Sequence, residues 1–307
     1  MIVFEGDPTR WQTPAGGTAV AVGVFDGVHL GHRAVFGALA PAPDDTVPGV
    51  VTFDPNPATV LGSGTTALTT LRRRLELMAD AGLAVASVVT FDEELAARSP
   101  QDFIDSFLVE ALAAKVVAVG EGFRFGHGAS GTTDTLVEAG RRHGFEVRVV
   151  PILEIDGVPV RSSLIRRRIV TGDVGGAARF LGRPHELEGS VVPGDGRGRT
   201  IGIPTANIEI DDDLTVPARG VYAVRVHVGP AVVDGVANIG TRPTFDGIEE
   251  VVEVHLLDVS QDLYGAHLRI EFLDRIRGER RFPDVEALVT QIHDDIAATR
   301  RILHPDG

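Results

Sequence analysis

The sequence predicts two domains: an α/β domain built on a mostly parallel sheet, then a small antiparallel β-barrel with a C-terminal helix. Three observations lead to this prediction. At 307 residues the chain is long enough for two separate cores. Up to residue 183, short apolar runs alternate with segments of helical spacing, which indicates a parallel sheet covered on both faces. From residue 184 onward period-two alternation dominates, and this favours an antiparallel barrel or sandwich.

In the first domain, apolar runs predict strands and helical spacing predicts helices between them. The predicted strands are residues 19–25, 49–53, 85–91, 116–119 and 145–150, and the predicted helices are residues 68–79 and 99–113. The second helix has Ser99 as its N-cap, Pro100 at its first position and Asp102 in its first turn. In such folds ligands bind beyond the carboxyl ends of the strands.

In the second domain, residues 221–228, 251–257 and 268–272 alternate with period two, and residues 284–303 return to helical spacing. The boundary is expected at residues 181–184, where Gly182 can end a helix and Pro184 prevents its continuation. The predicted domains are therefore residues 1–183 and 184–307.

Composition excludes several classes of function. The formal net charge of −14 argues against a nucleic-acid or anionic-membrane partner, because both need a broad positive surface. The absence of cysteine excludes disulfides, thiol nucleophiles and cysteine-ligated metals. Lys115 is the single lysine, so no GxxxxGK[ST] phosphate loop exists. No apolar run reaches the ~20 residues of a membrane helix and no signal sequence is recognisable, so we expect a cytoplasmic protein.

The junction between the strand at residues 19–25 and the following helix carries the strongest chemical signal. It reads Asp26-Gly27-Val28-His29-Leu30-Gly31-His32. Histidines three apart at a helix start lie near unpaired backbone N–H groups and the positive end of the helix dipole, which suits phosphate. Gly31 between them permits close approach to the backbone. The alternative is one core and one surface histidine beside an ordinary turn, but the strand and helix on either side favour a nucleotidyl-transfer site.

Three further segments of the first domain have the composition of a binding site. Residues 52–57, which include Asn56, leave a strand in a loop stiffened by two prolines, and residues 120–128 place Phe123, Arg124 and Phe125 among four glycines. At residues 161–168, hydroxyl caps and four arginines at a helix start form a candidate triphosphate clamp. The alternatives are a simple turn, a mobile loop and a solvated basic helix, respectively.

The second domain carries its own candidate chemistry. Thr205 and Asn207 point to the same side of an extended segment and offer hard oxygen ligands for magnesium brought in by ATP. The glycine-rich segment 194–202 before them can close over phosphates, and a surface hairpin is the alternative for its glycines. Glu253 lies on the polar face of an alternating strand, where it is either a general base or merely solvated. The loop 238–244 adds Asn238 and Arg242 as polar groups.

Together these motifs resemble known families. The histidine junction resembles the HxGH nucleotidylyltransferase superfamily. Over residues 20–303 the order of motifs resembles the prokaryotic bifunctional riboflavin kinase/FMN adenylyltransferase (FAD synthetase) family. The matching segments are residues 23–32, 123–126, 162–163, 165–166, 198–200, 204–207, 238–244, 253–255 and 263–265. The resemblance implies a Rossmann-like nucleotidylyltransferase domain followed by a riboflavin kinase barrel.

The resemblance also implies roles for individual residues. The C-terminal domain would phosphorylate riboflavin to FMN with ATP and Mg²⁺, Thr205 and Asn207 holding the metal and Glu253 acting as base. The N-terminal domain would adenylylate FMN to FAD and release pyrophosphate, with His29 and His32 contacting the reacting phosphates. The implied phosphate- and nucleotide-binding residues are Gly23, Phe25, Asp26, Gly31, Ser162, Ser163, Arg166, Gly198, Arg199 and Thr200. The implied flavin and loop residues are Asn56, Phe123, Arg124, Phe125, Asn238 and Arg242.

The first domain departs from the family pattern at Asn56, Gly122, Arg161 and Leu164. Because Asn56 replaces a histidine and Gly122 removes a side chain, three alternatives stay open beside the bifunctional enzyme. One is a monofunctional riboflavin kinase whose N-terminal domain is weakened or altered in specificity. The others are a non-enzymatic flavin or nucleotide sensor, and a nucleotidyltransferase that acts on another acceptor.

Overall fold

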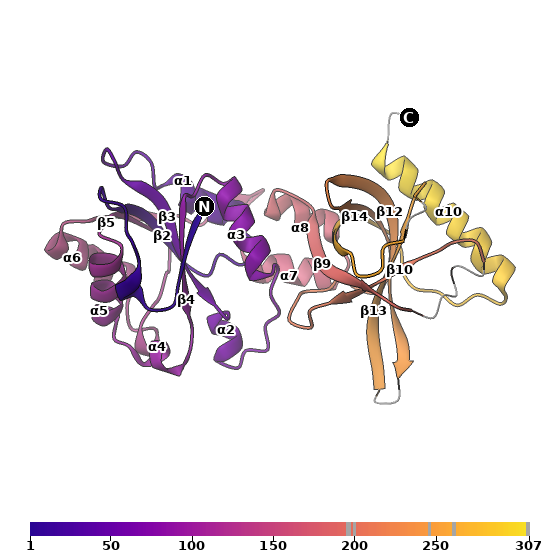
Figure 1. The fold of residues 1–307 in the computed structure, drawn as a ribbon, viewed down its shortest axis with the longest axis horizontal. Coiled ribbons are helices and arrows are strands. Elements are labelled where there is room, and N and C mark those ends of the chain that lie inside the picture. Colours follow the sequence, from indigo (N-terminus) through magenta and orange to yellow (C-terminus); the bar gives the residue numbers. More distant parts are fainter. Residues whose placement is uncertain (195–197, 199–200, 245–246, 260–261, 305–307) are drawn as a thin grey trace. The chain divides into compact units, whose positions relative to one another are not determined.

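The chain forms two compact units, Met1–Ser162 and Ser163–Gly307 (Figure 1). The computed structural model describes residues 1–194, 198, 201–244, 247–259 and 262–304, without the side chains of residues 242–249. Each unit has the predicted architecture, a parallel α/β sheet in the first and an antiparallel barrel in the second. The division by contacts falls at Ser162, and the predicted domain limit at residue 183 stays a prediction.

The first unit is built on one parallel sheet in the order β1-β4-β3-β2-β5-β6. Its strands are β1 (Ile2–Glu5), β2 (Thr18–Val22), β3 (Val47–Asp54), β4 (Val85–Thr90), β5 (Ala114–Gly120) and β6 (Glu146–Val150). Strands β2 to β6 confirm the five predicted strands. The pattern did not predict β1, which has only four residues, none of them buried, and therefore lacks an apolar signal.

Alternate residues of β2 enter different cores, which is why this strand is apolar from Ala19 onward. Ala19 and Ala21 pack on the side of α1 (Leu30–Gly37) and α3 (Leu71–Asp80), whereas Val20 and Val22 pack on the opposite side. That opposite side is covered by α6 (Thr133–His143) and the π-helix η2 (Ile104–Ala111). The shorter helices are η1 (Pro8–Arg10), α2 (Pro57–Val60), α4 (Glu93–Ala97), α5 (Pro100–Phe103) and η3 (His127–Ala129).

The helix predicted at residues 99–113 is only partly an α-helix. Its start is confirmed, because Ser99 and Asp102 form a reciprocal capping box around Pro100. After Phe103 the chain widens into the π-helix η2, whose apolar residues still face the core. Apolar spacing alone does not distinguish these two windings over eight residues.

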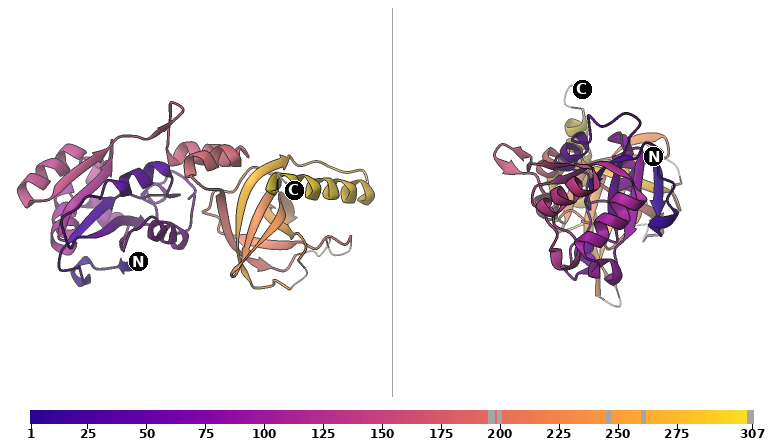
Figure 2. Two further views of the ribbon diagram at one scale, coloured as in Figure 1. Left: turned by 90° about the horizontal axis from the view of Figure 1, so that it is seen from above. Right: turned by 90° about the vertical axis from the view of Figure 1, so that its left-hand side faces the viewer.

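The second unit is a closed antiparallel barrel in the order β10-β13-β12-β11-β14-β9. Its strands are β9 (His185–Val192), β10 (Ala206–Ile210), β11 (Gly220–Val228), β12 (Ala231–Thr244), β13 (Gly247–Leu256) and β14 (His267–Arg277). Helix α8 (Val174–Leu181) packs on β9 and β14, and α10 (Val285–Leu303) lies against β11, β12 and β14 (Figure 2). Helix α7 (Ser162–Val170) precedes α8. The two-stranded ribbon of β7 (Glu154–Ile155) and β8 (Val158–Pro159) comes before α7 and belongs to the first unit.

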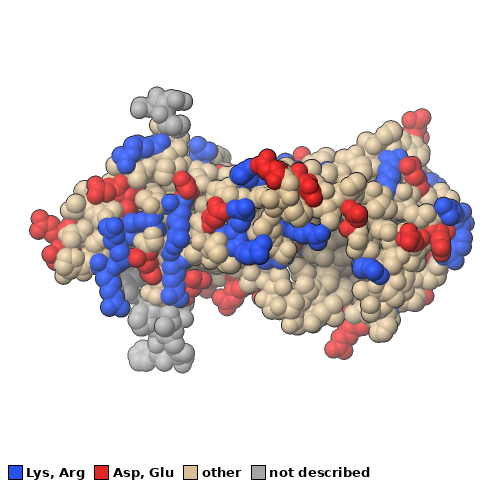
Figure 3. Space-filling view, turned by 180° about the vertical axis from the view of Figure 1, so that it is seen from behind, with Lys and Arg blue, Asp and Glu red and all other residues tan. Residues whose placement is uncertain are grey.

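Charge is mixed on the one face of the molecule that Figure 3 shows. On the face in Figure 3, lysine and arginine side chains lie interspersed with aspartate and glutamate. No helix in the described part of the chain is long and apolar enough to span a membrane. The expectations of a cytoplasmic location and of no nucleic-acid partner stay predictions.

Buried His185 makes the stability of the second unit depend on pH. Its Nε2 lies 2.9 Å from the carbonyl oxygen of Thr215, and burial lowers the pKa of His185 from 6.5 to about 4. The unfolded chain therefore binds a proton more readily between these values, and stability falls as pH drops from 6.5 toward 4. We expect the titration of His185 to lower the free energy of unfolding by about 3 kcal/mol. In His185→Leu, the free energy of unfolding should fall by less between pH 7 and pH 4, the difference from wild type being that amount. Urea unfolding followed by tyrosine circular dichroism measures this free energy at each pH.

Candidate active sites

The order of strands in the first unit places the histidine motif at a topological switch point. β2 is flanked by β3 and β5, so the chain moves to opposite sides of β2 in the two halves of the sheet. Loops that leave two such neighbouring strands diverge, and the crevice between them is the usual ligand site of an open α/β sheet. The β2 loop carries His29 and His32.

The two imidazoles lie together at the start of α1. His29 is buried and is the N-cap residue, and its Nδ1 accepts a hydrogen bond from the backbone N–H of His32 at 3.2 Å. In the neutral ring the proton is therefore on Nε2. The rings are stacked with centroids 3.4 Å apart. The predicted helix start with paired histidines is confirmed, and its amides and dipole suit an anion.

Close packing explains two of the three glycines at residues 23–32, Gly23 and Gly31. A Cβ on Gly31 would lie 3.1–3.2 Å from the His29 ring, and one on Gly23 would lie 3.0 Å from the Phe25 ring. Between them Phe25 and Val28 have φ angles of 54° and 41°, which are unfavourable for side chains with a Cβ. Strain of this kind persists only where surrounding contacts impose it and is typical of functional sites.

Hydrogen bonds from distant segments hold the β2 loop. The carboxylate of Asp26 accepts from the Leu68 backbone N–H at 2.8 Å, and the Asp26 carbonyl oxygen accepts from the Ser162 hydroxyl at 3.1 Å. The helix start predicted at Ser162 is confirmed as α7. Ser163 and Arg166 belong by contacts to the second unit, so their place at a triphosphate stays a prediction.

An aromatic cavity of about 390 Å³ opens at the same edge of the sheet. Its walls come from the segments after β2, β3, β4 and β5, and include Arg124. The phenylalanines that line it are Phe53, Phe91, Phe103, Phe123 and Phe125. Phe123 and Phe125 stack with centroids 5.5 Å apart. This size and composition suit a flat, largely apolar ring with an anionic end.

Asn56 has a structural task close to this cavity. Its side-chain oxygen caps α2 by accepting from the backbone N–H of Ala58 at 3.0 Å. Its neighbour Pro57 lines the cavity, whereas Asn56 is not among the lining residues. A ligand contact by Asn56 stays a prediction, and the sequence offered no sign of the cap beyond the Asn-Pro pair.

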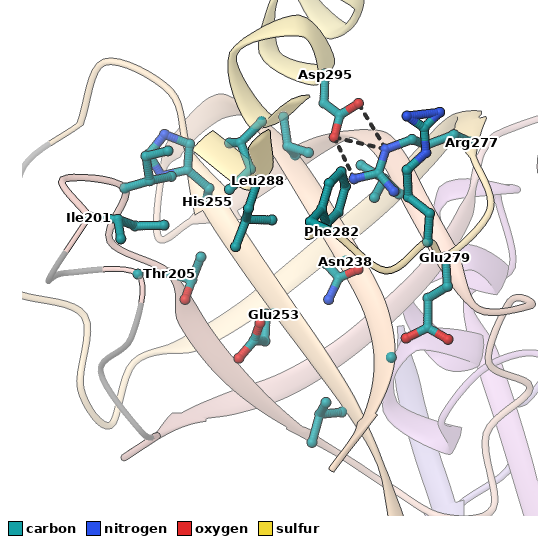
Figure 4. A pocket seen from close by; sticks show the side chains of 18 of the residues that line it. Ile201, Thr205, Asn238, Glu253, His255, Arg277, Glu279, Phe282, Leu288 and Asp295 are labelled. Carbon is teal, nitrogen blue, oxygen red and sulfur yellow. Dashed lines mark hydrogen bonds and ion pairs between the residues drawn. The ribbon is translucent and has the colours of Figure 1, made fainter. Parts of the chain in front are cut away.

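The second unit contains a cavity of about 430 Å³ between the barrel wall and α10 (Figure 4). Five predicted site residues line it together: Gly198, Thr205, Asn207, Asn238 and Glu253. Strand register explains why they meet. Asn207 of β10 and Asn238 of β12 are both paired with Glu253 of β13, so the three side chains form one row across the wall.

Neighbouring residues fix the segment that carries Thr205. The Nδ1–H of His255 donates to the carbonyl oxygen of Pro204 at 2.7 Å, which leaves Nε2 as the acceptor nitrogen. A Cβ on Gly198 would meet the Ile203 carbonyl oxygen at 2.3 Å, so only glycine fits there. The His255 hydrogen bond, together with the bond from the Ile203 backbone N–H to the Gly198 carbonyl oxygen at 2.8 Å, fixes the Pro204-Thr205 segment beside the cavity.

The outer wall of this cavity was not identified from the sequence. It includes Phe282, Leu288, Asp295 and Arg277 (Figure 4). The guanidinium of Arg277 donates Nη2–H to Asp295 at 2.8 Å and joins β14 to α10. The sequence predicted only helical spacing over residues 284–303, which does not show which face of α10 covers a ligand.

The polar residues of this cavity suit the binding of a hard cation that enters together with a phosphate group. Thr205 and Asn207 offer a hydroxyl and an amide oxygen on one wall. The described residues contain no group of three or more His, Cys, Asp or Glu that could hold a metal ion, and water or phosphate oxygens would complete such a site. The predicted residues Arg199 and Thr200, and the side chain of Arg242, lie outside the described residues.

These features define an enzyme class with two phosphate-handling sites, one typical of nucleotidyl transfer and one of phosphoryl transfer to a hydroxyl. Family models agree with this division: FAD synthetase matches residues 12–164, and riboflavin kinase matches residues 181–303. The chain belongs to the bifunctional riboflavin kinase/FMN adenylyltransferase family. The predictions of family, fold class and a bifunctional transferase are confirmed.

Individual relatives cover nearly the whole chain. The bifunctional riboflavin kinase/FMN adenylyltransferase of Escherichia coli K12 is 40% identical over 305 residues, which cover 98% of this chain and 97% of the relative. The Bacillus subtilis protein of the same name is 37% identical and covers 91% of this chain and 90% of its own. A solved structure described as a macrolide-efflux protein from Streptococcus pneumoniae superimposes with a TM-score of 0.89 at 32% identity, covering 98% of this chain and 99% of that one.

Proposed function

We propose that the second unit phosphorylates riboflavin and the first unit adenylylates FMN, each with the residues described above. The observation that carries this division is the row of Asn207, Glu253 and Asn238 beside Thr205, in a cavity separate from the histidine pair. A carboxylate beside oxygen donors suits attack of a hydroxyl on ATP. Paired imidazoles at a helix N-terminus suit charge stabilisation on phosphates.

In the kinase site, Glu253 accepts the proton of the ribityl 5′-hydroxyl. The hydroxyl oxygen forms a bond to the γ-phosphorus of ATP, the bond to the β–γ bridging oxygen breaks, and ADP and FMN result. Apolar residues including Phe282, Leu288 and Ile292 receive the flavin ring. Thr205 and Asn207 would hold Mg²⁺ with ATP, and the ion would neutralise the phosphate charge.

A smaller cavity of about 90 Å³ supports a position for ATP. Thr205 lines this cavity and the larger one, so a nucleotide can extend past Thr205 from one to the other. Its walls include Pro204, Leu256 and the half-exposed ring of Tyr264, which suit a flat base. A nucleotide in this position would have its triphosphate beside the predicted metal-binding oxygens.

In the adenylyltransferase site, a phosphate oxygen of FMN attacks the α-phosphorus of ATP and pyrophosphate leaves. No covalent intermediate with the protein is needed. His29 and His32 stabilise the negative charge that develops on the phosphates. The aromatic cavity receives the flavin ring, and Arg124 on its wall offers a cation to the phosphate end.

A two-substrate assay tests this proposal. The protein is incubated with ATP and Mg²⁺, once with riboflavin and once with FMN, and the products are separated by chromatography. We expect FMN and FAD in the first reaction and FAD in the second. FMN alone in the first and nothing in the second would identify a monofunctional kinase. No product in either would identify a sensor, and a bifunctional family makes both outcomes unexpected.

A further inference from the structure

Arg74 is a buried cation that no step above uses. It lies on α3 and is only 4% exposed. A buried guanidinium loses hydration, and ion pairs of this kind stabilise a fold little compared with apolar residues of similar size. Its retention inside the core therefore needs an explanation other than packing.

The guanidinium bridges the two loops that form the nucleotidyl-transfer site. Nη1–H donates to the carbonyl oxygen of Val24 at 3.1 Å, and Nη2–H donates to that of Phe53 at 3.0 Å. Nη2 also lies 3.3 Å from the carboxylate of Asp54. Val24 follows β2 and precedes the histidine motif, whereas Phe53 and Asp54 end β3. Both Val24 and Phe53 line the aromatic cavity.

The segment just before α3 holds the loop after β2 through two further hydrogen bonds. Leu68 N–H donates to the Asp26 carboxylate at 2.8 Å, and Gly27 N–H donates to the Thr69 hydroxyl at 3.3 Å. Together with Arg74 these bonds surround the strained residues Phe25 and Val28. Such backbone conformations need external support, and α3 with its preceding turn supplies it.

Local charges keep Arg74 cationic in this setting. Burial lowers its pKa, and the negative charges of Asp26 and Asp54 oppose that effect. Arginine remains protonated in proteins, so both Nη groups stay donors. The planar fork can reach two acceptors at fixed directions, which a single ammonium group cannot do as well.

We propose that Arg74 is a positioning residue for adenylyl transfer, whose guanidinium fixes the β2 and β3 loops relative to each other. The inference rests on the proposed function of the first unit. A displacement of about 1 Å in reacting groups lowers rates by about 10²-fold, so loss of this bridge should act on turnover.

The test measures FAD formation from FMN in Arg74→Met and Arg74→Lys. We expect kcat to fall by about 10²-fold in Arg74→Met. Arg74→Lys keeps the charge but not the fork, and its kcat should lie between those of wild type and Arg74→Met. FMN formation from riboflavin should stay at the wild-type rate in both. The wild type must itself form FAD, and its failure to do so would refute the proposed function rather than the role of Arg74.

Two controls separate positioning from stability. Arg72→Met makes the same change at an exposed site of α3 and should leave FAD formation unchanged. Met78→Ala removes a fully buried side chain of α3 and should lower the melting temperature without a comparable fall in kcat. Equal kcat losses in Met78→Ala and Arg74→Met would overturn the proposal. If Arg74→Met does not fold, a wild-type kcat in Arg74→Lys would overturn it.

Discussion

Glu253→Gln is expected to lower the rate of FMN formation by about 10²–10⁴-fold, the usual contribution of a general base. Glutamine keeps the size of the side chain but cannot accept the proton of the ribityl hydroxyl. Conversion of FMN to FAD should be unchanged, because Glu253 lines the larger cavity of the second unit and not the aromatic cavity of the first. Chromatographic separation of FMN and FAD measures both activities in one preparation.

The matched control for this variant is Glu250→Gln on the same strand. Glu250 is exposed and lies outside the cavity. The Glu250→Gln variant should retain both activities. A loss of activity in this variant would reveal a general effect of removing a negative charge from β13. Loss of FMN and FAD formation together in Glu253→Gln would contradict the assignment of separate sites. A wild-type rate of FMN formation would exclude Glu253 as the base.

Period-two alternation predicted which side chains share a face of each strand in the second unit, and the candidate site residues chosen from it line one cavity. Glu253 and His255 lie on one face of a period-two strand, and both line the cavity. The pairing of Asn207 and Asn238 with Glu253 was beyond prediction, because it depends on which strands become neighbours when the barrel closes. The contact between Arg277 of β14 and Asp295 of α10, which are 18 residues apart, was also not predicted, because it depends on how α10 packs against the barrel.

In the first unit, the sequence predicted candidate groups for the chemistry but not the residues that hold them in place. The histidine pair stands in one short motif, whereas Arg74 reaches Val24 across 50 residues. In the sequence it looks like Arg72 and Arg73, which form ion pairs with Glu76. Which arginine bridges the loops and which pair with Glu76 depends on which side chain is buried. Burial depends on tertiary packing, and the spacing of apolar residues predicts it only approximately.

His29 is expected to have two separable roles, and its replacement by alanine should remove both. FAD formation should fall by about 10²–10³-fold, the usual loss when one preorganised donor to a developing charge is removed. The same change removes the N-cap of α1, since Nδ1 accepts from the His32 backbone N–H. Loss of a cap lowers stability by about 0.5–2 kcal/mol. FMN formation by the second unit should be unchanged.

His29→Ser separates the two roles, because a serine hydroxyl caps a helix but is too short to replace the imidazole. The melting temperature of His29→Ser should therefore exceed that of His29→Ala. Its rate of FAD formation should be as low as that of His29→Ala. His143→Ser, at the end of α6 and away from the cavity, is the matched control and should keep both activities. Wild-type FAD formation in His29→Ser would show that the imidazole only caps α1, and the chemistry assigned to the histidine pair would then be wrong.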